Sequence, residues 1–263
     1  MKIMGILNVT PDSFSDGGRF STVASAVAAG RAMFDAGAMI VDVGGESSRP
    51  GARPIDLAEE RQRTLPVVRQ LSRHGIVSID TRKAALAQEA VACGASILND
   101  TSGLLTPVAG RLGVGYVAMH SRGLPATMQD DPRYEDVVEE VWSALDLLAS
   151  KAARCGATQI WVDPGIGFGK TTAHNVGLLR SLSRACMREW PVLVGVSRKS
   201  VVGALTGRHV PRDRVSGSLG AAAAAWAAGV DLIRTHDVAD TNDLLTVLAS
   251  VSTRPCLTSP QPV

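Results

Sequence analysis

The chain has 263 residues, of which 45% are hydrophobic and 20% are charged, and its formal net charge is +2. This length and apolar content suffice for one large core, and two small domains would also fit. The charged residues form no block of Lys and Arg and no basic stripe with aromatic residues, so we expect no nucleic-acid partner.

The four cysteines lie far apart and never show the Cys-x-x-Cys spacing of zinc ribbons and redox pairs; they are Cys93, Cys155, Cys186 and Cys256. We interpret them as free thiols in a reducing compartment. The most apolar stretch, residues 219–230, is followed by Asp231 and falls short of the roughly 20 residues that a membrane helix needs. The opening MKIMGILNV is too short for a secretory signal, so we expect a cytoplasmic protein without a membrane partner.

Short apolar or β-branched runs alternate with stretches of helical spacing along the whole chain. The runs are residues 3–9, 39–45, 76–80, 96–100, 115–120, 159–165, 192–198 and 232–238, and the clearest helical stretches are Val23 to Asp35, Leu57 to Arg73 and Asp136 to Arg154. Nearly continuous apolar strands are typical of parallel strands covered by helices. Eight such units predict an α/β fold, a single-domain (β/α)8 TIM barrel over residues 1–250, followed by a C-terminal tail at 251–263.

A polar side chain stands at or just after the end of each predicted strand. These residues are Asn8, Glu46, Asp80, Asn99, His120, Asp163, Lys199 and His236. Polar residues end many strands because loops are solvated. An open doubly wound sheet, the competing architecture, would gather its ligand groups at one switch point. In a barrel all eight strand ends meet at one mouth, so the full set favours a barrel with a single site.

The segment PGIGFGKTT, residues 164–172, is similar to a phosphate-binding loop. A Walker A loop needs glycine where this chain has Pro164, which has no N–H to donate, so we do not assign that function. We expect Lys170 to be solvated. The loops TPDSFSDGGRF and ESSRPGARPI, after the first two strands, are long enough to act as lids or to be simple surface loops.

The residues at the expected mouth suit a flat heterocycle that carries a phosphate group. Asp80 and Asp163 accept hydrogen bonds, Asn99 both donates and accepts, and an amidine-like edge can donate two parallel N–H bonds to one carboxylate. Arg234 and His236 lie two residues apart on one side of the last strand, where barrels commonly bind phosphate. Asn8 offers one oxygen ligand for magnesium, provided that substrate phosphates complete the shell. Ser197 lacks a G-x-S-x-G elbow, which argues against a serine nucleophile.

Eight motifs in order resemble those of bacterial dihydropteroate synthases. They are GILNVTPDSFSDGG, DVGGESSRPGA, SIDTRK, ILNDTSG, MHSRGLPATMQ, DPGIGFGK, GVSRKS and RTHDV, from Ile3 to about Val238. The resemblance implies the barrel fold. It also implies an enzyme that joins 6-hydroxymethyl-7,8-dihydropterin diphosphate to 4-aminobenzoate, releasing pyrophosphate and making 7,8-dihydropteroate for folate synthesis.

The resemblance also implies roles for individual residues. The pterin diphosphate would be bound by Asp80, Asn99, Met119, Asp163, Lys199, Arg234, Thr235 and His236, with Arg234 stacked on the ring. Of these, Asp80, Lys199, Arg234 and His236 would be catalytic, and Asn8 would ligate Mg²⁺. The aminobenzoate pocket would be formed by Phe14, Asp16, Ser48, Arg49 and Pro50 from two closing loops, with Phe168, Lys199 and Ser200 beside them. A homodimer through the outer helices is usual in the family.

Three positions depart from the family pattern: Ser48 replaces Thr, Ser121 stands where Met is common, and Val201 replaces a larger residue. They leave open whether sulfonamides, which mimic aminobenzoate, inhibit the protein. Two other functions remain as alternatives: a pterin-binding methyltransferase that acts on a corrinoid, and a non-catalytic pterin-binding paralogue. The motif ESSRPGA favours the synthase over the methyltransferase.

Overall fold

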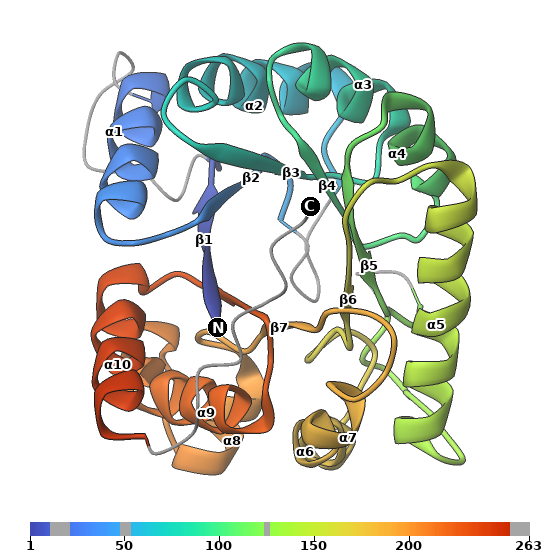
Figure 1. Cartoon of the computed structure of the whole chain (residues 1–263), viewed down its shortest axis with the longest axis vertical. Helices are drawn as coiled ribbons and strands as arrows, with labels where there is room; N and C mark the ends of the chain where they lie inside the picture. The colour runs from blue at the N-terminus through green and yellow to red at the C-terminus, as the bar shows by residue number, and fades with distance from the viewer. Residues whose placement is uncertain (11–21, 48–53, 124–126, 253–263) are drawn as a thin grey trace.

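The computed structural model describes residues 1–10, 22–47, 54–123 and 127–252. Eight strands lie in the centre of the molecule, and the helices surround them (Figure 1). The strands are β1 (Lys2–Asn8), β2 (Ile40–Gly44), β3 (Ile76–Asp80), β4 (Ile97–Asp100), β5 (Gly115–Met119), β6 (Ile160–Asp163), β7 (Leu193–Gly195) and β8 (Leu232–Thr235).

All paired strands are parallel, in the order β6-β5-β4-β3-β2-β1-β8-β7. A parallel bridge between Val162 and Val192 joins β6 to the residue before β7, so the sheet is a nearly closed barrel. The predicted (β/α)8 barrel is therefore confirmed.

The helices follow the strands as the sequence predicted. They are α1 (Thr22–Asp35), α2 (Leu57–Leu71), α3 (Ala84–Ala92), α4 (Thr106–Leu112), α5 (Val137–Cys155), α6 (Thr172–Arg180), α7 (Leu182–Ala185), α8 (Ser200–Thr206), α9 (Val215–Ala228) and α10 (Val238–Val251), with a 3₁₀ turn, η2, at Pro211–Arg214. Residue chemistry sets the ends of α5: the Asp136 carboxylate accepts hydrogen bonds from the N–H groups of Val138 and Glu139, and Gly156 ends the helix at φ 100°. Within the described ranges, no helix is both long and apolar enough to cross a membrane.

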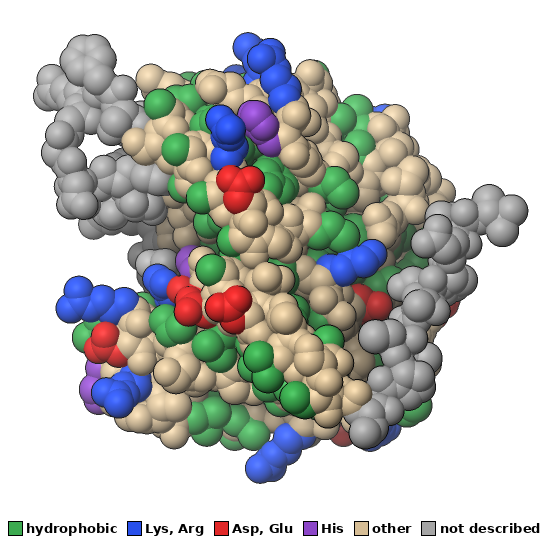
Figure 2. All heavy atoms as spheres, turned by 60° about the vertical axis from the view of Figure 1, so that its left-hand side comes forward, with side chains coloured by type: hydrophobic (Ala, Val, Ile, Leu, Met, Phe, Trp, Pro, Cys, Tyr) green, Lys and Arg blue, Asp and Glu red, His purple; other side chains and the backbone are tan. Residues whose placement is uncertain are grey.

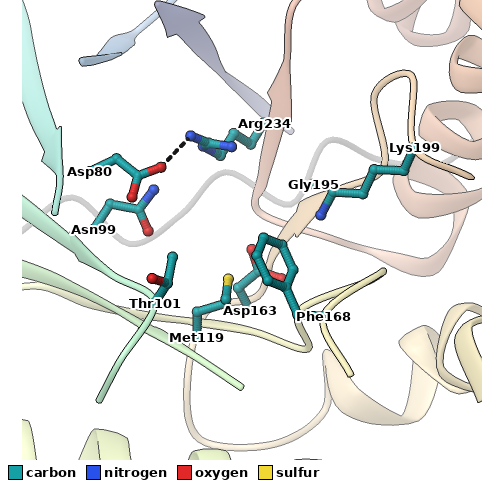
Figure 3. A pocket seen from close by; sticks show the side chains of 9 residues that line it. All are labelled: Asp80, Asn99, Thr101, Met119, Asp163, Phe168, Gly195, Lys199 and Arg234. Carbon is teal, nitrogen blue, oxygen red and sulfur yellow. Dashed lines mark hydrogen bonds and ion pairs between the residues drawn. The ribbon is translucent and has the colours of Figure 1, made fainter. Parts of the chain in front are cut away.

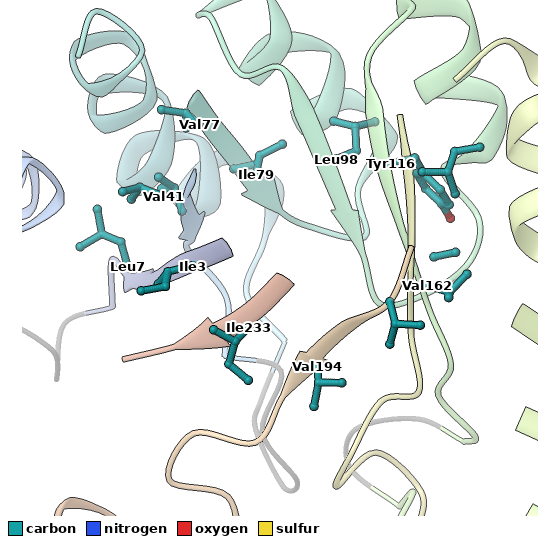
Figure 4. Close-up of a cluster of buried hydrophobic side chains, with 14 of the residues drawn as sticks. Ile3, Leu7, Val41, Val77, Ile79, Leu98, Tyr116, Val162, Val194 and Ile233 are labelled. Carbon is teal, nitrogen blue, oxygen red and sulfur yellow. The ribbon is translucent and has the colours of Figure 1, made fainter. Parts of the chain in front are cut away.

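Alternate residues of each strand face opposite sides of the barrel wall, which gives the protein two cores. The outer core lies between strands and helices; it includes Ile3, Leu7, Val41, Val77, Ile79, Leu98, Tyr116, Val162, Val194 and Ile233 (Figure 4). The inner core fills the barrel near the start of the strands with Met4, Ile40, Ile97, Val117, Trp161, Leu193 and Leu232.

Four of the seven inner-core residues are followed, two positions further along the strand, by a polar side chain. Leu232 is followed at this spacing by Arg234, Trp161 by Asp163, Ile97 by Asn99 and Ile40 by Asp42. The inner core therefore forms an apolar floor, and a layer of charged and amide side chains stands directly on it.

Candidate active site

A pocket opens above the apolar floor at the carboxyl ends of the strands; the space within it and at its open mouth, solvent included, is about 270 Å³. Its lining comprises Asp80, Asn99, Thr101, Met119, Asp163, Phe168, Gly195, Lys199 and Arg234 (Figure 3). Six of the barrel strands or the residues directly after them contribute to it, together with the loops that carry Phe168 and Lys199. Seven of the residues expected at the site are therefore gathered there, and Thr101 and Gly195 are additions.

Arg234 lies between two carboxylates. Its Nη2 is 2.9 Å from Asp80 Oδ2 and 2.7 Å from Asp42 Oδ2, and its side chain is 16% exposed. Asp42 was not identified as a site residue from the sequence, because it lies inside a strand and not at its end. The available signal was an acidic residue within the otherwise apolar run MIVDVGG, since a buried carboxylate needs a partner.

Burial shifts the ionisation of the acids and the lysine in the pocket. Burial raises the pKa of Asp80 to about 7; Arg234 opposes this shift, and Asp42, Glu60 and Asp100 add to it. Burial also raises the pKa of Asp163, against the opposing charge of Lys199. The pKa of Lys199 is lowered by burial to about 8, although Asp163 favours its charged form. Asp80 and Lys199, whose pKa values normally lie far apart, therefore both change charge near neutral pH.

Lys199 and Asp163 also frame the open part of the pocket. The ammonium of Lys199 donates to the Ile166 carbonyl at 2.6 Å and lies 4.8 Å from the centre of the Phe168 ring. A Cβ added to Gly195 would lie 3.7 Å from Lys199 Nζ and 3.9 Å from Asp163 Oδ2, so glycine keeps this space available for a ligand.

The loop between β6 and α6 turns sharply beside the pocket. Gly165 and Gly169 have φ values of 64° and 63°, and added Cβ atoms would lie 1.9 Å from the His120 carbonyl oxygen and 2.2 Å from that of Arg122. Gly165 also donates its N–H to Asp163 Oδ1 at 2.8 Å. The glycines of PGIGFGK thus let the chain pass close to its neighbours while it holds a pocket carboxylate.

The expectation that Lys170 is solvated is wrong. Its side chain is buried, and its ammonium donates to the carbonyl oxygens of Phe168 at 3.0 Å, Gly165 at 3.1 Å and His120 at 3.3 Å. It also lies 3.0 Å from His120 Nδ1. Burial lowers the pKa of His120 to about 3, so the neutral ring can accept from the lysine. Lys170 is buried because it satisfies the carbonyl groups that the glycine turns point inward.

The loops after β7 and β8 are tied together by adjacent residue pairs. Ser197 Oγ is 3.0 Å from His236 Nδ1, and Arg198 forms a two-point ion pair with Asp237. Arg198 has φ 58°, and no other non-glycine residue in the described part of the chain has a positive φ. Ser197 is thereby a partner of His236, in a contact that orients its ring.

The other expected residues are distributed as follows. Asn8 ends β1; a Cβ added to Gly44 would lie 3.8 Å from Asn8 Oδ1 and 3.6 Å from Asp80 Cβ, so both side chains border one glycine. The Thr235 hydroxyl accepts from the Asp237 N–H, away from the pocket, and Ser200 is exposed at the start of α8.

Two of the eight strand-end residues face other partners. Glu46 pairs with Arg82 and Lys83, which holds the pKa of Glu46 below its usual value against the effect of burial, and His120 contacts Lys170. The expected loop residues Phe14, Asp16, Ser48, Arg49 and Pro50 lie outside the described residues.

Replacing Lys170 with Met tests its role as an internal hydrogen-bond donor. We expect Lys170→Met to lower the free energy of unfolding by roughly 1–3 kcal/mol, because the carbonyl groups around the ammonium lose their donor. Urea denaturation followed by circular dichroism measures this loss. The matched control is Lys151→Met at an exposed position of α5, which should stay within about 0.5 kcal/mol of the parent. Equal stability of the two variants would contradict the assignment.

Comparison with known proteins agrees with this geometry. The family model described as pterin binding enzyme matches residues 4–236. The dihydropteroate synthase of Escherichia coli strain K12 is 42% identical over 254 residues, which cover 94% of this chain and 90% of the relative.

Two solved structures of dihydropteroate synthase from Xanthomonas albilineans are similar over the whole barrel. The one with 4-aminobenzoic acid has a TM-score of 0.90 and 44% identity, and the one in complex with 7,8-dihydropteroate has a TM-score of 0.86 and 40% identity. Each comparison covers 97% of this chain and 94% of the other. The chain belongs to the family of pterin-binding enzymes and, within it, to the dihydropteroate synthases.

Proposed function

We propose that this protein joins 6-hydroxymethyl-7,8-dihydropterin diphosphate to 4-aminobenzoate and releases 7,8-dihydropteroate and pyrophosphate. The observation that carries the proposal is the barrel-mouth pocket in which Asp80, Asn99, Asp163, Lys199 and Arg234 converge. The substrates are inferred from family membership, because the relatives are dihydropteroate synthases.

The deep part of the pocket suits the pterin ring. Asp163 and Asn99 are both only 4% exposed, so they can offer hydrogen bonds to the ring with little competition from water. The N–H groups at the edge of the Arg234 guanidinium donate to Asp42 and Asp80. The flat face of the guanidinium is therefore left for stacking on the pterin ring. Met119 and Phe168 supply apolar walls.

The diphosphate would lie near the carboxyl ends of β8 and β1, where Arg234, His236 and Asn8 stand. The Thr235 hydroxyl lies against Asp237 and Thr241, away from the pocket, so we assign the phosphate contacts to the other three residues. These groups place positive charge and N–H donors at the oxygen atoms that leave with the diphosphate.

Magnesium fits the residues present as a partner of the substrate phosphates. Among the described residues no three His, Cys, Asp or Glu side chains are grouped to hold an ion. Mg²⁺ keeps several waters and commonly needs only one or two protein oxygens besides phosphate, so the amide oxygen of Asn8 would suffice. When bound, the ion neutralises negative charge on the diphosphate.

We assign the aminobenzoate to the outer part of the pocket, beside Phe168, Lys199 and Ser200. Phe14, Asp16, Ser48, Arg49 and Pro50 are proposed to complete that pocket from the two loops. Support comes from the position of Phe168, whose ring faces the Lys199 ammonium at the rim, and from the exposed position of Ser200.

The residues suit a substitution at the methylene carbon of the pterin. The C–O bond to the diphosphate breaks and its electron pair leaves with pyrophosphate; the amine nitrogen forms the new C–N bond and loses one proton to solvent. Arg234 and His236 stabilise the departing charge, which is the main electrostatic contribution expected here. Positive charge that develops on the carbon and the ring is stabilised by the ionised carboxylate of Asp80. The aromatic amine is neutral at pH 7, so no strong base is required.

The proposal is tested by supplying pterin diphosphate, magnesium and 4-aminobenzoate and measuring pyrophosphate release. We expect release to depend on the amine, and Lys199→Ala and Asp163→Asn each to lower kcat/KM by roughly 100-fold or more, since each removes a charge from a site that excludes water. Lys151→Ala is the matched control and should retain parental activity. Circular dichroism establishes that the variants fold.

Two results would contradict the proposal. Pyrophosphate release at the same rate without amine would exclude the condensation. Tight pterin binding without turnover would instead indicate the non-catalytic paralogue.

The pKa shifts predict a narrow pH optimum. Asp80 must be ionised, and because its pKa is raised to about 7, kcat/KM should fall as pH drops through that value. Lys199 must be charged, and because its pKa is lowered to about 8, activity should also fall as pH rises through that value. In Lys199→Arg the alkaline limb of the profile should move upward, since arginine stays charged. An unchanged alkaline limb would show that another group causes it.

We also propose a homodimer in the cytoplasm. Exposed apolar side chains on the outer helices, Leu205 of α8 and Val247 and Val251 of α10, support association, and the free thiols of Cys93, Cys155 and Cys186 support a reducing compartment. On the face in Figure 2, Lys and Arg side chains of the described residues are interspersed with other side chains and form no continuous patch. Sedimentation equilibrium at micromolar concentration should give twice the chain mass; a single-chain mass would refute the dimer.

A further inference from the structure

Asp42 is a buried acid that no step of the proposed reaction uses. It lies in the middle of β2 and faces into the barrel, two residues before Gly44, which pairs with Asp80. Its side chain is completely buried, and it stands between the apolar floor and the pocket without lining the pocket itself. A carboxylate at such a depth is costly unless its charge is compensated.

One oxygen of Asp42 holds two residues of the pocket. Asp42 Oδ2 accepts from Asn99 Nδ2 at 2.8 Å and from Arg234 Nε at 2.7 Å. These contacts connect β2 with β4 and β8. Neither of these strands pairs with β2, whose neighbours in the sheet are β1 and β3. Asp42 is therefore the common anchor of two side chains that reach the pocket from different strands.

The contact with Asn99 fixes which way its amide points. An ionised carboxylate can only accept hydrogen bonds, so the NH₂ group of Asn99 must face Asp42. The amide oxygen and the second N–H of Asn99 are then left for the pocket in one defined arrangement. An amide without such an anchor could turn over and present the opposite pattern to a ligand.

The contact with Arg234 fixes the guanidinium in the same way. Arg234 is shared between Asp42 and Asp80 through its edge, so its plane cannot rotate without breaking a charge-assisted hydrogen bond. Both the amide pattern and the stacking surface offered to the ring thus depend on a residue that does not line the pocket.

We propose that Asp42 is a positioning residue for pterin recognition, which acts through Asn99 and Arg234 without touching the ligand; this inference rests on the proposed function. Removing its charge leaves Asn99 free to turn over and Arg234 with Asp80 alone. The loss falls on binding of the pterin and not on binding of the amine.

The experiment compares Asp42→Asn, which conserves shape, with Ser78→Ala. Ser78 is the register partner of Asp42 on β3; it is also fully buried, and its hydroxyl makes no hydrogen bond within the described residues. Calorimetric titration with pterin diphosphate should show a Kd raised roughly 10- to 100-fold in Asp42→Asn, the cost of losing hydrogen bonds to a charged group. The Kd should change less than threefold in Ser78→Ala, and the KM for 4-aminobenzoate should change less than threefold in both variants.

A double-mutant cycle separates positioning from general damage to the core. In an Asn99→Ala background the amide is absent, so Asp42→Asn should raise the Kd at least threefold less than it does in the parent. Equal costs in the two backgrounds, or an unchanged Kd in Asp42→Asn, would overturn the inference, and so would failure of Asp42→Asn to fold by circular dichroism. Absence of pterin diphosphate binding by the parent protein would refute the proposed function instead, so the two failures are distinguishable.

Discussion

Side chains along each barrel strand point alternately inward and outward, and this period of two residues sets the depth of the site residues that the strands carry. Leu232, Trp161 and Ile97 close the barrel, and Arg234, Asp163 and Asn99 follow them two residues later. Because all eight strands run in the same direction, these second positions lie at a similar height. The floor and the layer that binds the ligand are therefore consequences of a single repeat.

Charges in that layer are buried, and their compensation determines the chemistry available. Arg234 compensates Asp42 and Asp80, while Lys199 and Asp163 favour each other's charged forms. Compensation is incomplete, which is why burial still moves the pKa values of Asp80 and Lys199 toward neutrality. A ligand with N–H donors and an anionic end would supply hydrogen bonds to the buried carboxylates and a counter-charge to the buried cations.

The sequence predicted the barrel and most of the pocket because their signals are local. An apolar run followed by Asp, Asn or Lys identifies a strand end, and the parallel fold then brings Asp80, Asn99 and Lys199 together. Contacts across the barrel have no such signal. The burial of Lys170 depends on carbonyl groups that the glycine turns direct inward, the role of Asp42 depends on side chains from β4 and β8, and the partner of His236 is a serine 39 positions earlier. These features follow from geometry that only the folded chain defines.

The unusual backbone of Arg198 has a mechanical consequence. A non-glycine residue with its backbone in the left-handed region is strained. The ion pair between Arg198 and Asp237 helps to hold the backbone of Arg198 in this conformation. Lys199 follows Arg198 directly and His236 precedes Asp237, so this one ion pair links the two loops that carry Lys199 and His236. The loops that follow β7 and β8 therefore behave as one mechanical unit, and a shift of one loop would displace the other with it.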